Sequence, residues 1–337
     1  MQTRNTVGYF RLLNQNPSFR NLWYGQVVSE LGDWLNSIAI YALILKLSDS
    51  GMAMAGAMMA KLLPIVLVSP IAGVVVDRVS RKTVMIVSDL LRCVVVLAFL
   101  LVEDRDTLWL VYALVIVEIS LSGFFEPARS AIIPSLVPKE DLVTANALSG
   151  STWSVMLAFG AALGGVIVYL FGIKVAFILD AGTFILSAWF LSKIPSPKKS
   201  TKKDSSKQSG YQELLEAMRF LMAEPMVLVL SLLKAGLAVA GGIMTLIPLM
   251  ASQLLSGSLS LGIGILYSAR GLGAALGPIL VKRLFGETAS VLQWAIAGAF
   301  FLKAFSYLFI ATTHNIWTLS LGVGLATLFG SIIWVFS

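Results

Sequence analysis

The sequence predicts an all-α membrane protein with many spanning helices. Hydrophobic residues make up 57% of the 337 residues, whereas charged residues make up only 13%. Apolar runs long enough to cross a bilayer recur along the chain, separated by short polar breaks. A water-soluble core of this length needs no such composition. The runs lack the alternation of barrel strands, and a lipid-exposed backbone must satisfy its own hydrogen bonds, so we expect helices throughout.

The elements follow in order from the apolar runs. Each run approaches or exceeds the about 20 residues that cross a ~30 Å hydrocarbon core at about 1.5 Å per residue. We expect ten spans, at residues 22–45, 54–76, 83–102, 107–126, 142–170, 174–192, 225–252, 258–281, 288–311 and 315–337.

The basic residues in the breaks predict the orientation of the spans. One side of the membrane carries Arg4, Arg11, Arg20, Arg78, Arg81, Lys82, Arg129, Lys139, the bases from Lys193 to Lys207, Lys282 and Arg283. The other side carries only Lys46, Arg105 and Lys174. Lys and Arg accumulate on the cytoplasmic side, so we expect the N-terminus in the cytoplasm. The first 21 residues lack the apolar core of a signal peptide, so the first span itself starts insertion.

The longest break divides the chain into two halves. Residues 1–192 form a predicted N-terminal half with six helices, and residues 193–224 form a cytoplasmic linker. The linker begins with a Pro/Ser/Lys-rich tether and continues as an amphipathic interfacial helix. Residues 225–337 form the C-terminal half, with about four helices. Its last apolar run stops at Ser337 without a flanking charge, so we expect it to be incomplete.

Several function classes lack support in the sequence. Cys93 is the only cysteine and His314 the only histidine, which excludes an internal disulfide and argues against a metal site. The basic tract at 198–207 lacks aromatic interleaving, so we expect a solvated loop and no nucleic-acid partner. The Gly-rich "GLGAALG" lies inside a span and follows no strand, and there is no Walker sequence or serine-triad context. We therefore expect no enzyme and no cofactor.

One short turn carries more charge than anchoring requires. The stretch "GVVVDRVSRK" at 73–82 joins the second and third spans, and its bases Arg78, Arg81 and Lys82 suit a cytosolic, anionic lipid surface. Asp77 can lie near the N-terminus of the third span, where the helix dipole favours a negative charge. Gly73 permits a neighbouring helix to approach closely.

This turn resembles the loop signature of the major facilitator superfamily, G-x-x-x-D-R-x-G-R-K/R, with Ser80 in place of the second Gly. The resemblance implies a two-half helical bundle. It also implies a charge-paired lock on the cytoplasmic face, engaged in one conformation and broken in the other. Asp77 and Arg81 would be lock residues, together with Gly73, Arg78 and Lys82 from the same motif. Glu126, at the inner end of the fourth span, is a candidate partner.

Further stretches extend this resemblance. "GAALGG" at 160–165 resembles the core of the antiporter motif G-P-x-x-G-G, with Ala161 in place of Pro. Gly160, Gly164 and Gly165 would form its small face, and tight packing alone is the alternative interpretation. "FRNLWYGQVVSELGDW", "LPIVLVSPIAGVVVDR", "PARSAIIPSLVPKEDLVTANAL" and "EAMRFLMAEP" are similar to the drug:proton antiporter branch with macrolide-efflux-type permeases and enterobactin-type siderophore exporters. The resemblance implies twelve helices, so spans eleven and twelve would be absent here.

Ionisable residues inside spans are candidates for function because each costs on the order of 2.5–3.5 kcal/mol at a helix centre. Glu30 and Asp33 lie about 12 and 16 Å into the first span, at positions i and i+3 on one helix face. Such a pair can hold a proton, and it requires a water-filled cavity or a cation. The cation candidates at similar depth are Arg92, Lys234 and Arg270, and Glu118 is a further acid.

Two alternatives remain open for these charges. They could be fixed ion pairs that hold helices together. Glu118 also departs from the family pattern, which often has an Arg at this level of the fourth span, so either Arg92 takes that role or coupling differs. In the seventh span, Gly236, Gly241, Gly242 and Pro248 would let the helix bend, although small residues also serve packing.

The combined hypothesis is a monomeric secondary transporter in a prokaryotic inner membrane. It would export an amphiphilic small molecule, such as a drug, macrolide or siderophore, driven by the proton gradient alone. Its partners would be substrate, protons and lipid. Two alternatives are a non-transporting fragment that modulates a full-length partner, and proton-coupled uptake on the same fold.

Overall fold

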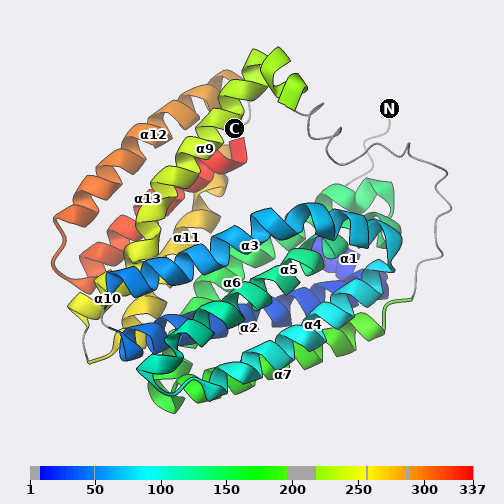
Figure 1. Cartoon of the computed structure of the whole chain (residues 1–337). Helices are drawn as coiled ribbons and strands as arrows, with labels where there is room; N and C mark the ends of the chain where they lie inside the picture. Colours follow the sequence, from blue (N-terminus) through cyan, green and yellow to red (C-terminus); the bar gives the residue numbers. More distant parts are fainter. Residues whose placement is uncertain (1–7, 49, 196–217, 256, 286–288, 337) are drawn as a thin grey trace.

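The computed structural model describes residues 8–48, 50–195, 218–255, 257–285 and 289–336, and these residues form helices with no strand. Figure 1 shows the helices in two groups, coloured blue to green and yellow to red. Most of the predicted linker, at 196–217, lies outside the described residues; residues 218–223 are helical.

The N-terminal group begins with the short helix α1 and continues with long helices joined by short turns. Its elements are α1 (Tyr9–Gln15), α2 (Pro17–Leu47), α3 (Gly51–Arg78), α4 (Arg81–Ala98), η1 (Phe99–Leu101), η2 (Arg105–Thr107), α5 (Leu108–Leu136), η3 (Lys139–Asp141), α6 (Leu142–Phe171) and α7 (Ile173–Ser192).

The C-terminal group contains α9 (Pro225–Gly241), η4 (Gly242–Leu246), α10 (Ile247–Leu254), α11 (Leu259–Phe285), α12 (Ala289–Ala311) and α13 (Ile316–Phe336). Among the described residues, ten helices are long and apolar enough to cross a membrane, with η1, η2, η3 and η4–α10 counted into their neighbours. They coincide with the ten predicted spans, so the prediction of an all-α polytopic membrane protein is confirmed.

Local sequence signals explain where the helices begin and end. The Asn16 side chain accepts a hydrogen bond of 2.9 Å from the Phe19 N–H, and Pro17 fills the first helical position of α2. Ser50 accepts in the same way from Met52 at the start of α3, at 3.2 Å. Gly172, with φ of 86°, joins α6 to α7 in a conformation that favours glycine. These short connections make neighbouring helices antiparallel.

The seventh predicted span changes its helix type at its glycines. The α-helix α9 ends at Gly241, and the 3₁₀ segment η4 follows before α10 resumes. A Cβ atom added to Gly236, Gly241 or Gly242 would meet nothing within 4 Å. Gly241 and Gly242 therefore lie at the change in helix geometry, and in this conformation none of the three glycines packs against a neighbouring helix.

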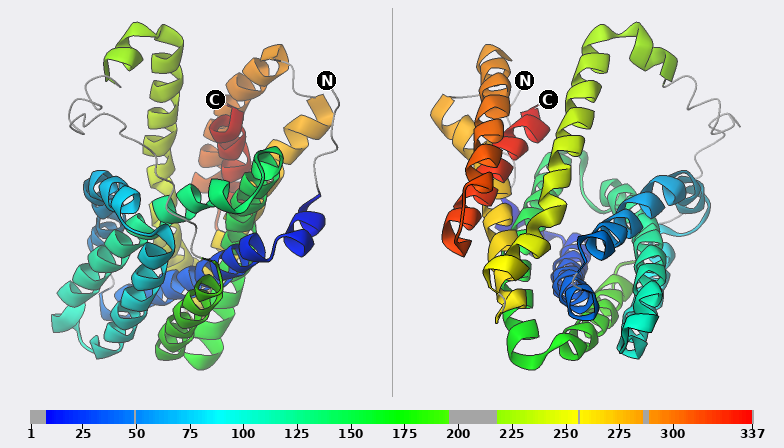
Figure 2. Two further views of the ribbon diagram at one scale, coloured as in Figure 1. Left: turned by 90° about the vertical axis from the view of Figure 1, so that its right-hand side faces the viewer. Right: turned by 60° about the vertical axis from the view of Figure 1, so that its left-hand side comes forward.

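The alternating helices give the bundle two faces. The N-terminal face is the one at which α2 begins, α3 turns into α4, and α7 ends; the distal face carries the turns from α2 to α3, α6 to α7 and α10 to α11. In Figure 1 the two groups form a V with its apex near α10, on the distal side, and the V opens toward the N-terminal face. Figure 2 shows the same divergence from two further sides.

The contacts between the two groups lie in the distal part of the bundle, where α6 crosses α11. A Cβ atom on Gly165 would lie 2.7 Å from the Ser260 carbonyl oxygen and 3.0 Å from the Cα of Gly264. One helical turn further, the Ser268 hydroxyl donates a hydrogen bond of 2.8 Å to the Ala158 carbonyl. The absence of side chains at this crossing allows the two backbones to touch.

This crossing predicts the effect of a small substitution. Gly165→Ala should lower the melting temperature of the purified protein, because overpacking costs about 1–3 kcal/mol and exceeds the about 1 kcal/mol that alanine gains over glycine in a helix. Gly150→Ala is the matched control on α6, since its Cβ would meet nothing within 4 Å. Equal melting temperatures for the two variants would contradict this account of the crossing.

Candidate functional site

Four helices of the N-terminal group bring charged side chains together around Arg92. The Arg92 guanidinium, from α4, forms an ion pair with Asp33 of α2. Its Nη1 lies 3.9 Å from Oδ1 of Asp89, and its Nη2 lies 3.9 Å from Oε1 of Glu118 on α5. Asp180 of α7 also interacts electrostatically with the Arg92 guanidinium. One buried arginine thus serves several carboxylates, and we call these five residues the Arg92 cluster.

Local packing explains why these side chains meet. A Cβ atom on Gly32 would collide with the side chains of Asp180 and Thr183, so the glycine lets α2 and α7 approach closely beside Asp33. The Asn36 amide donates a hydrogen bond of 2.7 Å to Oε1 of Glu118 and fixes the orientation of that carboxylate. The guanidinium carbon of Arg92 lies 4.2 Å from the centre of the Phe184 ring, a favourable cation–π distance.

Exposure separates Asp33 from the rest of the cluster. Its side chain is 35% exposed, compared with 3% for Arg92 and 6% for Glu118. Asp89 and Asp180 are fully buried. Asp33 is therefore the member of the cluster whose side chain is most exposed.

Glu30 belongs to a second chain of contacts. Its Oε1 accepts a hydrogen bond of 2.8 Å from the Gln26 amide, and Oε1 of Gln26 accepts one of 3.0 Å from Arg129. Arg129 also pairs with Glu126 at 2.6 Å. Glu30 is thus linked by hydrogen bonds to residues nearer the N-terminal face, and it does not contact the Arg92 cluster.

Sequence reasoning missed three ionisable residues of this region: Lys61, Asp89 and Asp180. The Lys61 ammonium group donates hydrogen bonds to the hydroxyls of Ser37, at 3.0 Å, and Tyr41, at 3.2 Å. All three residues lie inside predicted spans, at 54–76, 83–102 and 174–192. The signal that identified Glu30 and Asp33, a charge within an apolar run, was therefore present for them too.

The predicted cations of the C-terminal group lie apart from the cluster. Lys234 lies 5.5 Å from the Trp334 ring centre, and Arg270 lies 5.6 Å from that of Tyr267. Lys303, which was not predicted, is 7% exposed and lies 5.7 Å from the Tyr307 ring. Within the described residues none of the three forms an ion pair.

The predicted lock residues occupy the N-terminal face, and their charges are not paired with one another among the described residues. Asp77 and Arg78 are exposed. Arg81 donates a hydrogen bond of 2.7 Å to the Ala131 carbonyl, and Lys82 donates bonds of 2.6 Å to the carbonyls of Ser192 and Ile194. In this conformation Lys82 therefore binds carbonyls at the end of α7, where they lack helical partners, and Arg81 binds the carbonyl of Ala131 on α5.

The structure shows this turn in one conformation. Glu126, the candidate partner of the lock, pairs here with Arg129 one helical turn along α5, so its pairing with the lock stays a prediction. Gly73 is exposed, and a Cβ atom there would meet nothing within 4 Å, so the expected close helix approach is absent. The approach that small residues permit occurs at other glycines.

The antiporter-like motif packs tightly against two helices. A Cβ atom on Gly160 would lie 3.0 Å from the Cβ of Trp34, and one on Gly164 would lie 3.1 Å from Cγ1 of Ile38, both on α2. Gly165 faces α11. The motif therefore joins α2 of the Arg92 cluster to the contact between the two groups.

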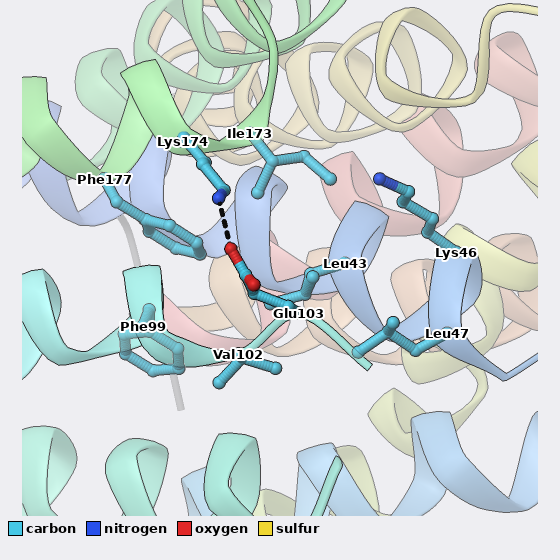
Figure 3. Close-up of a pocket in the computed structure, with 9 residues that line it drawn as sticks. All are labelled: Leu43, Lys46, Leu47, Phe99, Val102, Glu103, Ile173, Lys174 and Phe177. Carbon is cyan, nitrogen blue, oxygen red and sulfur yellow. Dashed lines mark hydrogen bonds and ion pairs between the residues drawn. The ribbon is translucent and has the colours of Figure 1, made fainter. Parts of the chain in front are cut away.

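A separate pocket of about 240 Å³ opens near the distal face and is shown in Figure 3. Lys46, Glu103 and Lys174 line it together with apolar side chains, and the Lys174 ammonium donates a hydrogen bond of 2.7 Å to Glu103. This bond and the charge of Lys174 lower the pKa of the Glu103 carboxyl. The ion pair therefore stabilises the folded state at pH values above the ordinary pKa of glutamate. This stabilisation is lost as the pH falls through the lowered pKa of Glu103. Both side chains are 65% exposed, so the contribution is small.

The single cysteine and histidine agree with their predicted roles. Cys93 is a free, buried thiol, and His314 is exposed in the break between α12 and α13. No group of three or more metal-ligating side chains occurs among the residues that the structure describes.

Comparison with known proteins identifies the family. The sequence model of the transmembrane secretion effectors, a family of the major facilitator superfamily, matches residues 11–336. The chain belongs to this family. Its curated relatives include the uncharacterized MFS-type transporter YfiS of Bacillus subtilis, 31% identical over 223 residues, which are 64% of this chain and 53% of the relative. The predicted family is thus confirmed, and its members are transporters rather than enzymes, as expected.

Two further relatives are named for efflux. The putative bacilysin exporter BacE of Bacillus subtilis is 28% identical and matches 53% of this chain and 44% of its own length. Macrolide efflux protein A of Streptococcus pyogenes is 25% identical, and the match covers 62% of this chain and 52% of that protein. The chain therefore spans about half the length of the curated relatives it matches.

A solved structure supports the fold. A bacterial homolog of the human lysosomal transporter Spinster, in an inward-facing and unoccupied conformation, superposes with a TM-score of 0.67 at 17% identity. The match covers 95% of this chain and 75% of that chain. The major-facilitator-type helical fold predicted from the sequence is confirmed.

The Arg92 cluster predicts how stability depends on its one arginine. Arg92→Gln should lower the melting temperature at neutral pH, because removing one partner of a buried ion pair costs about 3–5 kcal/mol. Lowering the pH should restore part of this loss, since protonated carboxyls need no counter-charge. Arg105→Gln, which removes an exposed arginine at the distal face, is the charge-matched control. A pH-independent loss of stability would contradict the electrostatic explanation.

Proposed function

We propose that this chain exports an amphiphilic small molecule in exchange for protons, by alternating access of one central site to the two sides of a prokaryotic inner membrane. The observation that carries this proposal is the pairing of the accessible carboxylate of Asp33 with the buried Arg92. A carboxylate at a helix centre that remains open to entering molecules can bind either a proton or a cationic group of a substrate. Competition for one carboxylate couples the two fluxes without a cofactor.

The arrangement of the helices supports alternating access. The two groups touch in the distal part of the bundle and diverge toward the N-terminal face. The bases of residues 1–21, the 73–82 turn and 193–207 all belong to that face by sequence, so it is the proposed cytoplasmic face. The described conformation then corresponds to a state open to the cytoplasm, and rocking of the two groups about the α6–α11 crossing would close it.

The predicted lock fits the same cycle. Asp77 is exposed and without an ion pair among the described residues while the bundle is open to the N-terminal face. Closure of that face would bring the turn against the C-terminal group, where the charge pairing implied by the family motif forms. The lock would thus stabilise the state open to the distal side.

Export rather than uptake is the proposed direction because of the relatives. Two of them are named as a macrolide efflux protein and as a putative bacilysin exporter. These names suggest an amphiphilic organic substrate, and the position of Asp33 suggests that it carries a cationic group. The chain is proposed to act as a monomer.

Transport in everted membrane vesicles tests the proposal. With an acidic interior, the wild-type chain should accumulate tetraphenylphosphonium, and Asp33→Asn should reduce the initial rate at least about tenfold, or about 1.4 kcal/mol in activation free energy. Glu103→Gln, at the distal face, is a control that removes a carboxylate outside the site and should leave the rate unchanged.

The alternatives give different results in the same system. Accumulation only in right-side-out vesicles would indicate uptake. No accumulation by the wild type in either orientation, despite insertion into the membrane, would favour a fragment that modulates a partner. Undiminished accumulation by Asp33→Asn would refute the role of this carboxylate.

A further inference from the structure

A buried carboxylate beside the proposed coupling site has no hydrogen-bond partner among the described residues. Asp89 is fully buried, and neither Oδ1 nor Oδ2 accepts a hydrogen bond. The Ser187 hydroxyl on α7 is equally buried and lies close enough to act on the Asp89 carboxyl, although no hydrogen bond of ordinary geometry joins the two groups. An ionised carboxylate without donors is costly in a low-dielectric interior, and the neutral acid avoids that cost.

The guanidinium of Arg92 lies between Asp89 and Asp33. Its Nη2 contacts Asp33, whereas its Nη1 lies 3.9 Å from Oδ1 of Asp89. That distance is about 1 Å longer than an ordinary N–H···O hydrogen bond of about 2.9 Å. Asp89 and Arg92 are three residues apart on one face of α4, so side-chain rotation alone can close the gap.

The surrounding charges do not offer Asp89 another counter-ion. The ionisable groups that face Asp89 and Arg92 come from every helix packed around them. Asp33 and Glu126 repel a negative charge on Asp89, Arg92 attracts it, and Glu118 and Asp180 interact with Arg92. Two other cations of these helices are bonded elsewhere, Lys61 to Ser37 and Tyr41, and Arg129 to Gln26 and Glu126. Arg92 is therefore the cation for which Asp33 and Asp89 compete.

We propose that Asp89 stores a proton while Arg92 is paired with Asp33, and that Arg92 moves to Asp89 when a cationic substrate group takes its place on Asp33. The inference rests on the proposed function and changes one part of it: the proton that the substrate displaces is held by Asp89 instead of Asp33, and Arg92 carries the competition between the two carboxylates. As Arg92 arrives, the O–H bond of Asp89 breaks, and the proton leaves to water on the accessible side of Asp33. One substrate charge enters and one proton departs. When the substrate leaves, Arg92 returns to Asp33 and Asp89 takes up one proton.

This arrangement makes Asp89 a positioning and proton-storing residue that the substrate does not touch. The substrate binds at Asp33, which is 35% exposed, while the proton comes from a residue that is fully buried. Binding and proton release are thus assigned to different side chains. A substitution of Asp89 should therefore abolish proton release without abolishing substrate binding.

Two measurements on the purified full chain in detergent test the inference. The first is infrared spectroscopy without substrate, in which the spectrum of the wild type minus that of Asp89→Asn should contain the C=O stretch of one protonated carboxylic acid, whatever bands Asp180 and the other buried acids contribute to both. The second adds tetraphenylphosphonium in lightly buffered solution and follows binding and proton release together. Glu103→Gln is the control variant in both, because it removes an exposed carboxylate at the distal face.

The expected pattern separates the two aspartates. Asp89→Asn should bind tetraphenylphosphonium with an affinity within about threefold of the wild type, less than about 1 kcal/mol, and release no proton. Asp33→Asn should lose binding. Asp89→Glu keeps a titratable group and should recover release, which separates proton storage from a merely structural role and provides a readout if Asp89→Asn folds poorly.

Other outcomes overturn the inference and are distinguishable from failure of the proposed function. Undiminished proton release by Asp89→Asn, or a wild-type-minus-variant spectrum without an acid C=O band, refutes the role of Asp89 but leaves proton-coupled export intact. Absence of proton release from the wild type refutes the proposed function and this inference with it. Loss of binding in Asp89→Asn and Asp89→Glu alike would assign Asp89 a structural role only.

Discussion

The ion pair between Arg92 and Asp33 is the interaction on which the N-terminal group depends. Asp33, Asp89, Glu118 and Asp180 come from α2, α4, α5 and α7, and a single guanidinium acts on all four. In a membrane, each uncompensated charge at a helix centre would cost on the order of 2.5–3.5 kcal/mol. The four helices must therefore converge on Arg92, and the packing around it follows from that requirement.

The glycines of the bundle are placed where this convergence needs them. Gly32 lets α7 lie against α2 beside Asp33, and Gly164 lets α6 lie against α2 near Ile38. Gly165 then brings α6 against α11 of the other group. A continuous set of close contacts thus connects the charged cluster to the crossing between the two groups. Any change in the charge of Asp33 acts on helices that also form this crossing.

Much of the fold could be predicted from the sequence because a bilayer imposes simple rules of length and hydrophobicity. All ten spans were located in this way, and the "GVVVDRVSRK" turn gave the family. The site was harder to predict. A charged residue within an apolar run shows that its burial must be compensated, but it does not show which residue compensates it. Asp33, Arg92 and Glu118 were predicted separately, yet their meeting depends on helix rotation. The neighbour expected at Gly73 depends on helix rotation in the same way, and in this conformation Gly73 is exposed.

The two helix groups carry different charges inside their spans. In the described spans of the C-terminal group the ionisable side chains are the bases Lys234, Arg270 and Lys303, with no acid among them. The six spans predicted from the sequence for the N-terminal group instead hold six carboxylates and three bases. In the proposed cycle, closure of the groups on the N-terminal side would bring the bases of one toward the acids of the other, and a neutral cluster would gain less from that approach than a charged one. The protonation state of the Arg92 cluster would then bias which side of the membrane is open, so that a proton on Asp89 or a substrate cation at Asp33 is linked to the conformation of the whole bundle.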